Sequence, residues 1–273
     1  MDIDRYYRRI GIDKPSPDAA GLRRLQSAQM NAVTFENIDP LLGIVPDVSL
    51  EGIFDKIVGS GRGGYCFELN TLFGAALKAT GFEASRVMAR VRNGAPQGAN
   101  RSHLAWIVTV GGEEWLADTG FGGSGTSIPL PIASREVQQA PTGRYRFTED
   151  TAAGELVLER ETPDGWYSLF GFDRVPVRDA DIEAANFVTA RWEKAPFPSN
   201  LMLSRHTGEG RISLLNTALR IESADGVTKR TITSPDEMQA VLSGDFALPV
   251  DAALAAEIWR RLEACGRIER LAG

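Results

Sequence analysis

Residues 61–70 read GRGGYCFELN, and they place a cysteine directly after a run of glycines and directly before a helical pattern. After Cys66, apolar residues recur at helical spacing as far as Leu77, and Gly81 stands where such a helix would end. The N-terminus of this helix offers unpaired backbone N–H groups and a partial positive charge, which both favour a thiolate. Cys66 is therefore a candidate nucleophile, with a buried and inert cysteine as the alternative.

The hydrophobic period changes along the chain. The pattern is helical to about residue 84. From Ser85 onward, short segments rich in β-branched and aromatic residues are separated by Gly, Pro or Asp, which predicts an antiparallel sheet or small barrel. The last part mixes short strands with a final helix, and the prolines of EKAPFPSN at 193–200 are typical of a linker.

Composition narrows the class of protein. The chain has 273 residues, 43% of them hydrophobic, which is typical of a globular protein with a sizeable core. A net charge of −6 without a basic run argues against nucleic-acid binding, and no segment is long and apolar enough to span a membrane. We expect a cytoplasmic protein with reduced cysteines. Two cysteines and two histidines without zinc-like spacing predict no metal site.

Two glycine-rich stretches fit the spacing of a dinucleotide-binding fingerprint, GSGRGG at 59–64 and GFGGSG at 120–125. That fingerprint must follow a strand and open a helix. The first stretch follows a helical pattern, and the second precedes the proline-rich TSIPLPIAS. Neither context fits, so the glycines need another explanation.

The segment 101–123, RSHLAWIVTVGGEEWLADTGFGG, predicts a β-hairpin whose two-residue turn is Gly111–Gly112. Counting outward from this turn places Asp118 diagonally across from His103 on the same face, roughly 7–8 Å away at Cα. A one-residue bulge would move Asp118 to the opposite face. With the regular register, Asp118 orients His103 and His103 accepts the proton of Cys66, as acyl transfer requires.

Three motifs, in the same order, resemble those of the arylamine N-acetyltransferases. RGGYCFELN at 62–70 resembles the family's R-G-G-x-C-F-E-x-N signature. SHLAWIVTVGGEEWLADTGFGG at 102–123 is similar to its histidine strand, tight turn and D-x-G-F-G segment, and FENID at 35–39 resembles a third motif, F-E-N-[LI]. The resemblance covers the whole chain and is most specific up to about residue 130.

The resemblance implies a triad of Cys66, His103 and Asp118 that works by ping-pong chemistry through an acetyl-cysteine. It implies acetyl-CoA as co-substrate, an arylamine, hydrazine or arylhydroxylamine as acceptor, and no permanently bound cofactor. Two alternatives remain open. One is a related amide synthase acting on a carrier-bound thioester, and the other is a CoA-binding protein without catalysis.

The resemblance also implies an α+β fold. A helical domain, residues 1–84, would carry the nucleophile on a papain-like helix. An antiparallel β-barrel, residues 85–190, would carry the histidine and the aspartate, and an α/β lid would span residues 191–273.

Further residues receive roles from the same resemblance. The acceptor pocket would contain Phe35, Phe121 and Phe187, for which core packing is the alternative. The candidate CoA contacts are Ser102, Gly120, Gly122 and Gly123; for the glycines, a strand-ending loop is the alternative to a backbone nest.

Residues outside the triad are expected to be structural. Arg62 and Glu36 are expected to form a partly buried ion pair that holds the loop. His206 lies in a polar segment and is predicted at the surface, whereas Cys265 is predicted to serve packing. The chain departs from the family by having Thr34 where proline is usual and glutamines where histidine is frequent. Those glutamines are Gln26 and Gln29.

Overall fold

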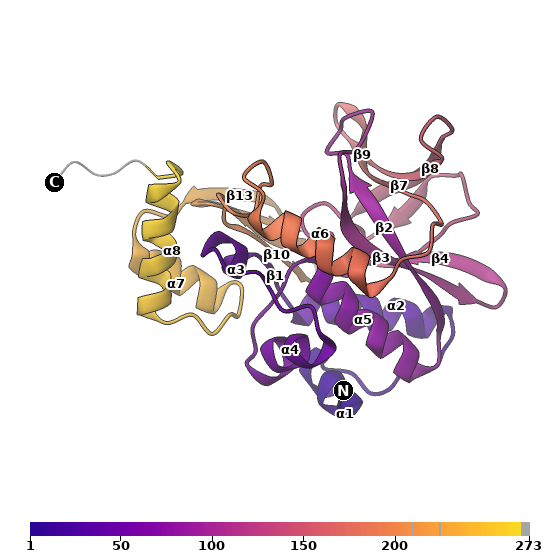
Figure 1. The fold of residues 1–273 in the computed structure, drawn as a ribbon, viewed down its shortest axis with the longest axis horizontal. Helices are drawn as coiled ribbons and strands as arrows, with labels where there is room; N and C mark the ends of the chain where they lie inside the picture. Colours follow the sequence, from indigo (N-terminus) through magenta and orange to yellow (C-terminus); the bar gives the residue numbers. More distant parts are fainter. Residues whose placement is uncertain (209, 224, 269–273) are drawn as a thin grey trace.

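The computed structural model describes residues 1–208, 210–223 and 225–268. It contains a helical part, an eight-stranded sheet and a five-stranded sheet that is covered by two helices (Figure 1). The helical part consists of α1 (Ile3–Ile10), α2 (Ala19–Ala32), α3 (Ile38–Leu41), α4 (Leu50–Phe54), the π-helix η1 (Asp55–Gly59) and α5 (Cys66–Thr80).

The larger sheet is antiparallel, has the strand order β5-β4-β3-β2-β9-β8-β7-β6, and curves into a barrel-like form (Figure 1). Its strands are β2 (Glu83–Val91), β3 (Arg101–Val110), β4 (Glu113–Ala117), β5 (Leu130–Pro131), β6 (Gln138–Ala140), β7 (Gly143–Asp150), β8 (Glu155–Thr162) and β9 (Gly165–Phe172). Helix α6 (Asp179–Arg191) follows this sheet and packs against β3.

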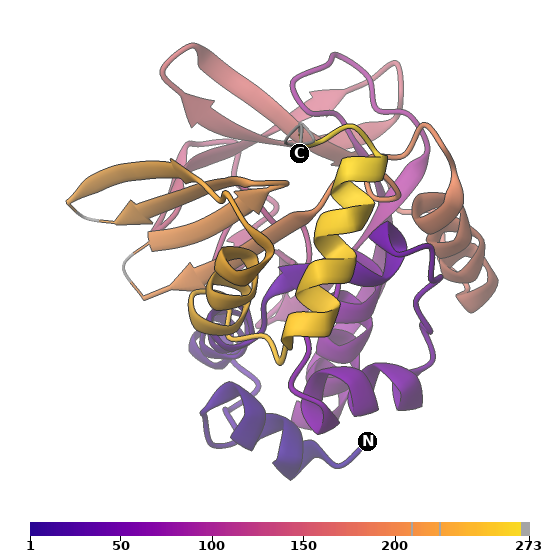
Figure 2. The same cartoon turned by 90° about the vertical axis from the view of Figure 1, so that its left-hand side faces the viewer.

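The smaller sheet has the order β1-β10-β11-β12-β13, and α7 and α8 lie together beside it (Figure 2). Its members are β1 (Phe35–Glu36), β10 (Met202–Thr207), β11 (Gly210–Leu215), β12 (Ala218–Ser223) and β13 (Gly226–Thr231), with α7 (Pro235–Gly244) and α8 (Ala252–Ala264). One apolar core joins this sheet to both helices. Because β1 pairs with β10, the helical part and the C-terminal part share a sheet.

The predicted α+β fold is confirmed, with helices, an antiparallel barrel-like sheet and a C-terminal α/β unit. The division into 1–84, 85–190 and 191–273 stays a prediction. None of the helices in the described part of the chain has the length and apolar character needed to cross a bilayer.

Helix α5 begins at Cys66 because the residues around it satisfy its N-terminus. The carboxylate of Glu68 accepts the backbone N–H of Tyr65 at 3.1 Å, as in a capping box. Gly81, with φ of +104°, ends the helix in the left-handed conformation that glycine favours. In the middle of the helix, a Cβ on Gly74 would lie 1.8 Å from the Trp106 indole, so only glycine lets β3 approach this closely.

The predicted hairpin between β3 and β4 is confirmed. Gly111 and Gly112 have φ of +60° and +83°, as their two-residue turn requires. The pairing runs without a bulge from the turn to Trp106 opposite Ala117. His103 and Asp118 therefore come from neighbouring chain segments at the end of this hairpin that packs on α5.

Gly74→Ala should destabilise the protein by about 1–3 kcal/mol, because the added methyl group must displace either the indole or the helix. Urea unfolding measures this change. Gly244→Ala in α7 is the matched control, since its Cβ meets nothing within 4 Å and alanine is the better helix former. Equal stability of the two variants would contradict the close contact between α5 and β3.

Candidate active site

Cys66 is the first residue of α5, and its side chain is almost entirely buried. Its thiol donates a long hydrogen bond of 3.5 Å to the carbonyl oxygen of Ser102 at the start of β3. The helix N-terminus and the first residues of β3 thus place the sulfur next to the segment that carries His103.

His103 and Asp118 form a buried pair, with 2.7 Å between Nε2 and Oδ2. The other carboxylate oxygen, Oδ1, accepts hydrogen bonds from Asn70 Nδ2 at 2.9 Å and from the backbone N–H groups of Gly120 and Phe121 at 2.8 and 3.1 Å. Burial alone raises the pKa of the Asp118 carboxyl, but the imidazole and these donors outweigh it and hold that pKa below its usual range. Asp118 is therefore an ionised acceptor, and Nδ1 of His103 is the ring nitrogen that remains for the thiol.

Asn70 was not among the predicted site residues, although it closes the GRGGYCFELN stretch. Its Nδ2 also donates to the carbonyl of Leu104, and its Oδ1 accepts the N–H of Thr119. The indole of Trp106 in turn donates to the Asn70 carbonyl at 2.7 Å. The sequence feature that could have identified Asn70 is its position one helical turn after Cys66, which puts it on the same face of α5 as that cysteine.

The surroundings of Cys66 oppose a thiolate. Burial raises the pKa of the Cys66 thiol, and the negative charges of Asp118 and Glu68 act in the same direction. Backbone N–H groups, including that of Phe67, lower the pKa but do not outweigh burial. The helix N-terminus alone does not depress this pKa, contrary to the simplest expectation from the sequence.

Five charged residues hold the loop in front of Cys66. Arg62 donates to Glu36 Oε1 through Nε and Nη2, at 3.0 and 2.7 Å, which confirms the predicted ion pair. Arg62 also bonds Asp39, and Lys56 joins Asp39 to Glu68. Burial raises the pKa of the Glu68 carboxyl to about 7, with the Lys56 charge opposing it. This network fixes the glycine-rich loop against the FENID segment.

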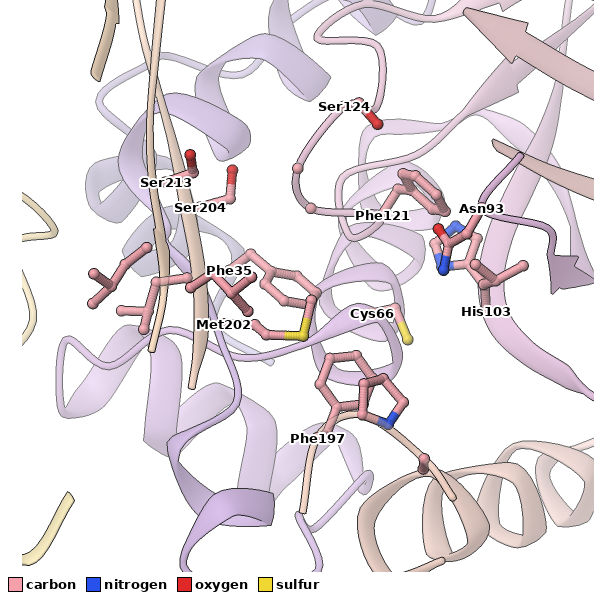
Figure 3. A pocket seen from close by; sticks show the side chains of 18 of the residues that line it. Phe35, Cys66, Asn93, His103, Phe121, Ser124, Phe197, Met202, Ser204 and Ser213 are labelled. Carbon is pink, nitrogen blue, oxygen red and sulfur yellow. The ribbon is translucent and has the colours of Figure 1, made fainter. Parts of the chain in front are cut away.

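A cavity of about 780 Å³ reaches Cys66 and His103 (Figure 3). Three phenylalanines from distant parts of the chain line it near the sulfur, namely Phe35, Phe121 and Phe197. All four predicted CoA contacts also line it, namely Ser102, Gly120, Gly122 and Gly123. These four residues therefore line the same cavity as Cys66 and His103, and their contact with CoA stays a prediction.

Phe187 is not part of this cavity, contrary to its predicted place. Its side chain is 58% exposed, whereas its neighbours Val188 and Thr189 line the cavity. Successive side chains of a helix point about 100° apart. Phe187 precedes Val188 by one residue and therefore points away from the cavity. Phe197, in the proline-containing linker, supplies an aromatic side chain that the sequence reasoning missed.

The glycines after Asp118 permit close packing. A Cβ on Gly120 would lie 2.8 Å from Cα of Cys66, and Gly122 has φ of +69° and sits against the ring of Phe35. The strand before this loop is not followed by a helix, and α5 follows no strand of a parallel sheet. The structure thus agrees with the rejection of a dinucleotide fingerprint.

His206 was predicted at the surface, and this was wrong. Only 5% of it is exposed, and neither ring nitrogen has a hydrogen-bond partner within the described residues. Burial, together with the nearby positive charge of Arg211, lowers the pKa of its imidazole to about 4. Strand alternation explains the error, because His206 shares the inward face of β10 with Met202 and Ser204. Cys265 is partly exposed at the end of α8.

Across residues 1–208, 210–223 and 225–268, no group of three or more His, Cys, Asp or Glu side chains is arranged to hold a metal ion.

Comparison with known proteins gives consistent matches. A sequence model of the N-acetyltransferase family matches residues 18–255. The arylamine N-acetyltransferase / N-hydroxyarylamine O-acetyltransferase of Salmonella typhimurium is 31% identical over 86% of this chain and 84% of that protein. The Escherichia coli arylamine N-acetyltransferase is 31% identical over 92% of this chain and 90% of its own length. The structure of the Mycobacterium marinum arylamine N-acetyltransferase in complex with CoA matches with a TM-score of 0.89, at 30% identity, and covers 97% of this chain and 99% of that one.

Iodoacetamide should alkylate Cys66 rapidly well below pH 8.5, the ordinary pKa of cysteine, because we expect the thiolate to form as an ion pair with His103 that offsets the cost of burial. His103→Gln removes the cation and leaves only the effect of burial, which raises the thiol pKa. Alkylation of this variant should therefore begin only above about pH 8.5.

Mass spectrometry of Cys66 across the pH range measures both profiles. Cys265 in the same molecule is the control, and its rate should not change between the two proteins. One step near pH 8.5 in both proteins would mean that no ion pair forms and that the proton moves only during attack.

Proposed function

The chain belongs to the arylamine N-acetyltransferase family, and on this premise we propose that it transfers an acetyl group from acetyl-CoA to the nitrogen of an arylamine, arylhydrazine or arylhydroxylamine. It is therefore an acyltransferase. The observation that carries the proposal is the buried contact of 2.7 Å between Asp118 and His103, since His103 lines the cavity that reaches Cys66.

In the first half-reaction, His103 takes the proton of the Cys66 thiol, and the thiolate attacks the carbonyl carbon of the acetyl thioester. A C–S bond to Cys66 forms, and the bond to the CoA sulfur breaks as the tetrahedral intermediate collapses. The protonated imidazole returns its proton to the leaving CoA thiolate, while Asp118 stabilises the imidazolium. The partial positive charge at the N-terminus of α5 favours the oxyanion of the intermediate.

In the second half-reaction, the amine nitrogen attacks acetyl-Cys66, and His103 removes a proton from that nitrogen. The C–S bond breaks and the enzyme thiol is regenerated. The aromatic rings of Phe35, Phe121 and Phe197 support an aromatic acceptor, because rings bind one another in offset or edge-to-face arrangements.

The register of the C-terminal sheet suggests where the phosphates of the donor bind. Ser204, Ser213, Arg220 and Lys229 are successive cross-strand partners in β10–β13, and all four line the cavity. Two cations in this row, in a chain of net charge −6, are suited to the phosphates of CoA. The next row toward Cys66 is less polar and suits the pantetheine arm; it contains Met202, Leu215, Ala218 and Thr231.

Ser102 and the glycines Gly120, Gly122 and Gly123 remain our proposed contacts for the donor near its thioester. We further propose a cytoplasmic protein without nucleic-acid or membrane partners; its net charge of −6 argues against binding to an anionic partner. The three domains 1–84, 85–190 and 191–273 are likewise proposed.

Acetyl-CoA alone should place one acetyl group on Cys66 and release one equivalent of CoA before any amine is added. Peptide mass spectrometry and a thiol assay measure the two products. Cys66→Ala should lose both signals and keep its thermal unfolding midpoint. An acetyl group on Cys265, or no CoA release without an amine, would contradict the proposal, and the second result would favour the amide synthase.

Replacing both Arg220 and Lys229 with glutamate should raise KM for acetyl-CoA by about tenfold or more, since charge complementarity to the phosphates is lost. Acylation by p-nitrophenyl acetate, which has no phosphate, should change little. The matched control reverses Arg135 and Arg144, two exposed cations that do not line the cavity. An equal rise in KM in both double variants would indicate long-range charge rather than a phosphate site.

A further inference from the structure

One buried amide on α2 contacts both ends of the segment that carries the triad carboxylate. Oε1 of Gln26 accepts the backbone N–H of Asp118 at 3.2 Å, and its Nε2 donates to the carbonyl of Thr126 at 3.3 Å. The side chain of Gln26 is fully buried. We call residues 118–126 the Asp118 segment; between its two ends lie the glycines that line the cavity.

A neighbouring glutamine, Gln29, fastens the same segment to the nucleophile helix. Its Nε2 donates to Thr119 Oγ1 and to the carbonyl of Leu69 in α5, both at 2.9 Å. Its Oε1 accepts the hydroxyl proton of buried Tyr6 at 2.6 Å. Helix α2 therefore binds the Asp118 segment at three residues: Gln26 binds the first and the last, and Gln29 binds the second.

Only a side chain with both a donor and an acceptor makes the two bonds of Gln26. A carboxylate would accept from Asp118 but would not donate to Thr126, and it would place a second negative charge beside the triad. An apolar side chain would leave a buried N–H and a buried carbonyl without partners, and neither group would regain the hydrogen bond that it makes to water in the unfolded chain. A neutral amide satisfies both groups and leaves the charge of Asp118 facing His103.

We propose that Gln26 is a positioning residue for acyl transfer: by bridging both ends of the Asp118 segment, it sets the distance between Asp118 and His103. This inference rests on the proposed function. It predicts that Gln26 acts on the rate of acylation rather than on the affinity for the donor, because it lines no part of the cavity.

The test compares Gln26→Met, which keeps the volume and removes both hydrogen bonds, with Ser27→Ala as the matched control. Ser27 is the next residue of α2 and donates to the carbonyl of Ser127, one residue past the Asp118 segment. In Gln26→Met we expect kcat for the acetyl-CoA reaction to fall about ten- to a hundredfold. A displacement of a catalytic group by about 1 Å lowers the rate by up to about a hundredfold. KM for acetyl-CoA should stay within about twofold, and Ser27→Ala should match the wild type in both constants.

Iodoacetamide alkylation of Cys66 supplies a readout that needs no donor. In Gln26→Met the low-pH step of the alkylation profile should shrink or move to higher pH, because a displaced Asp118 stabilises the imidazolium less well. If the wild type is not acetylated by acetyl-CoA, the proposed function fails, and this profile still tests Gln26. A variant that unfolds at a lower temperature but keeps the kcat and the alkylation profile of Ser27→Ala would overturn the inference.

Gln26→Asn is the second variant, in case the methionine protein does not fold. It keeps the amide but is one methylene shorter, so it cannot bridge Asp118 and Thr126. The same loss of kcat and the same change of profile are expected. Wild-type values in a folded Gln26→Asn protein would show that the bridge is not needed.

Discussion

The buried contact between His103 and Asp118 is the interaction on which the rest of this structure depends. A carboxylate without water is unfavourable unless hydrogen bonds replace its hydration. Here the replacements come from separate elements: His103 from β3, Asn70 from α5, and the backbone of Gly120 from the loop after β4. The helical part and the barrel-like sheet must therefore pack together before Asp118 can be buried as a carboxylate.

The close packing of α5 against this sheet follows from the same requirement. Asn70 reaches Asp118 only if α5 lies within contact distance of β3, and Gly74 allows that approach because Trp106 fills the space of a side chain. Gly120 allows the loop to pass over the backbone of Cys66 in the same way. Gly74 thus faces a side chain and Gly120 faces a backbone, and both mark close contacts between elements of the fold, which explains them better than nucleotide binding does.

The features that could be predicted from the sequence depend on residues close together in the chain. The Gly111–Gly112 turn fixes pairing by counting, so the approach of His103 to Asp118 followed from a few residues. The errors concern long-range packing. The outward direction of Phe187 and the burial of His206 depend on which face of α6 and β10 meets the rest of the protein, and no local pattern contains that information.

The shape of the cavity has a consequence for the order of the proposed reaction. Both the acetyl donor and the amine must reach the same sulfur, and Cys66 is only 4% exposed at the wall of the cavity. Aromatic side chains stand near Cys66, while the cations Arg220 and Lys229 stand on the C-terminal sheet. A donor bound by its phosphates would extend its thioester arm past those aromatic rings, in the space that an aryl acceptor needs. Departure of CoA then clears this space for the acceptor. An acetyl-Cys66 intermediate therefore allows the donor and the acceptor to bind one after the other in the same cavity.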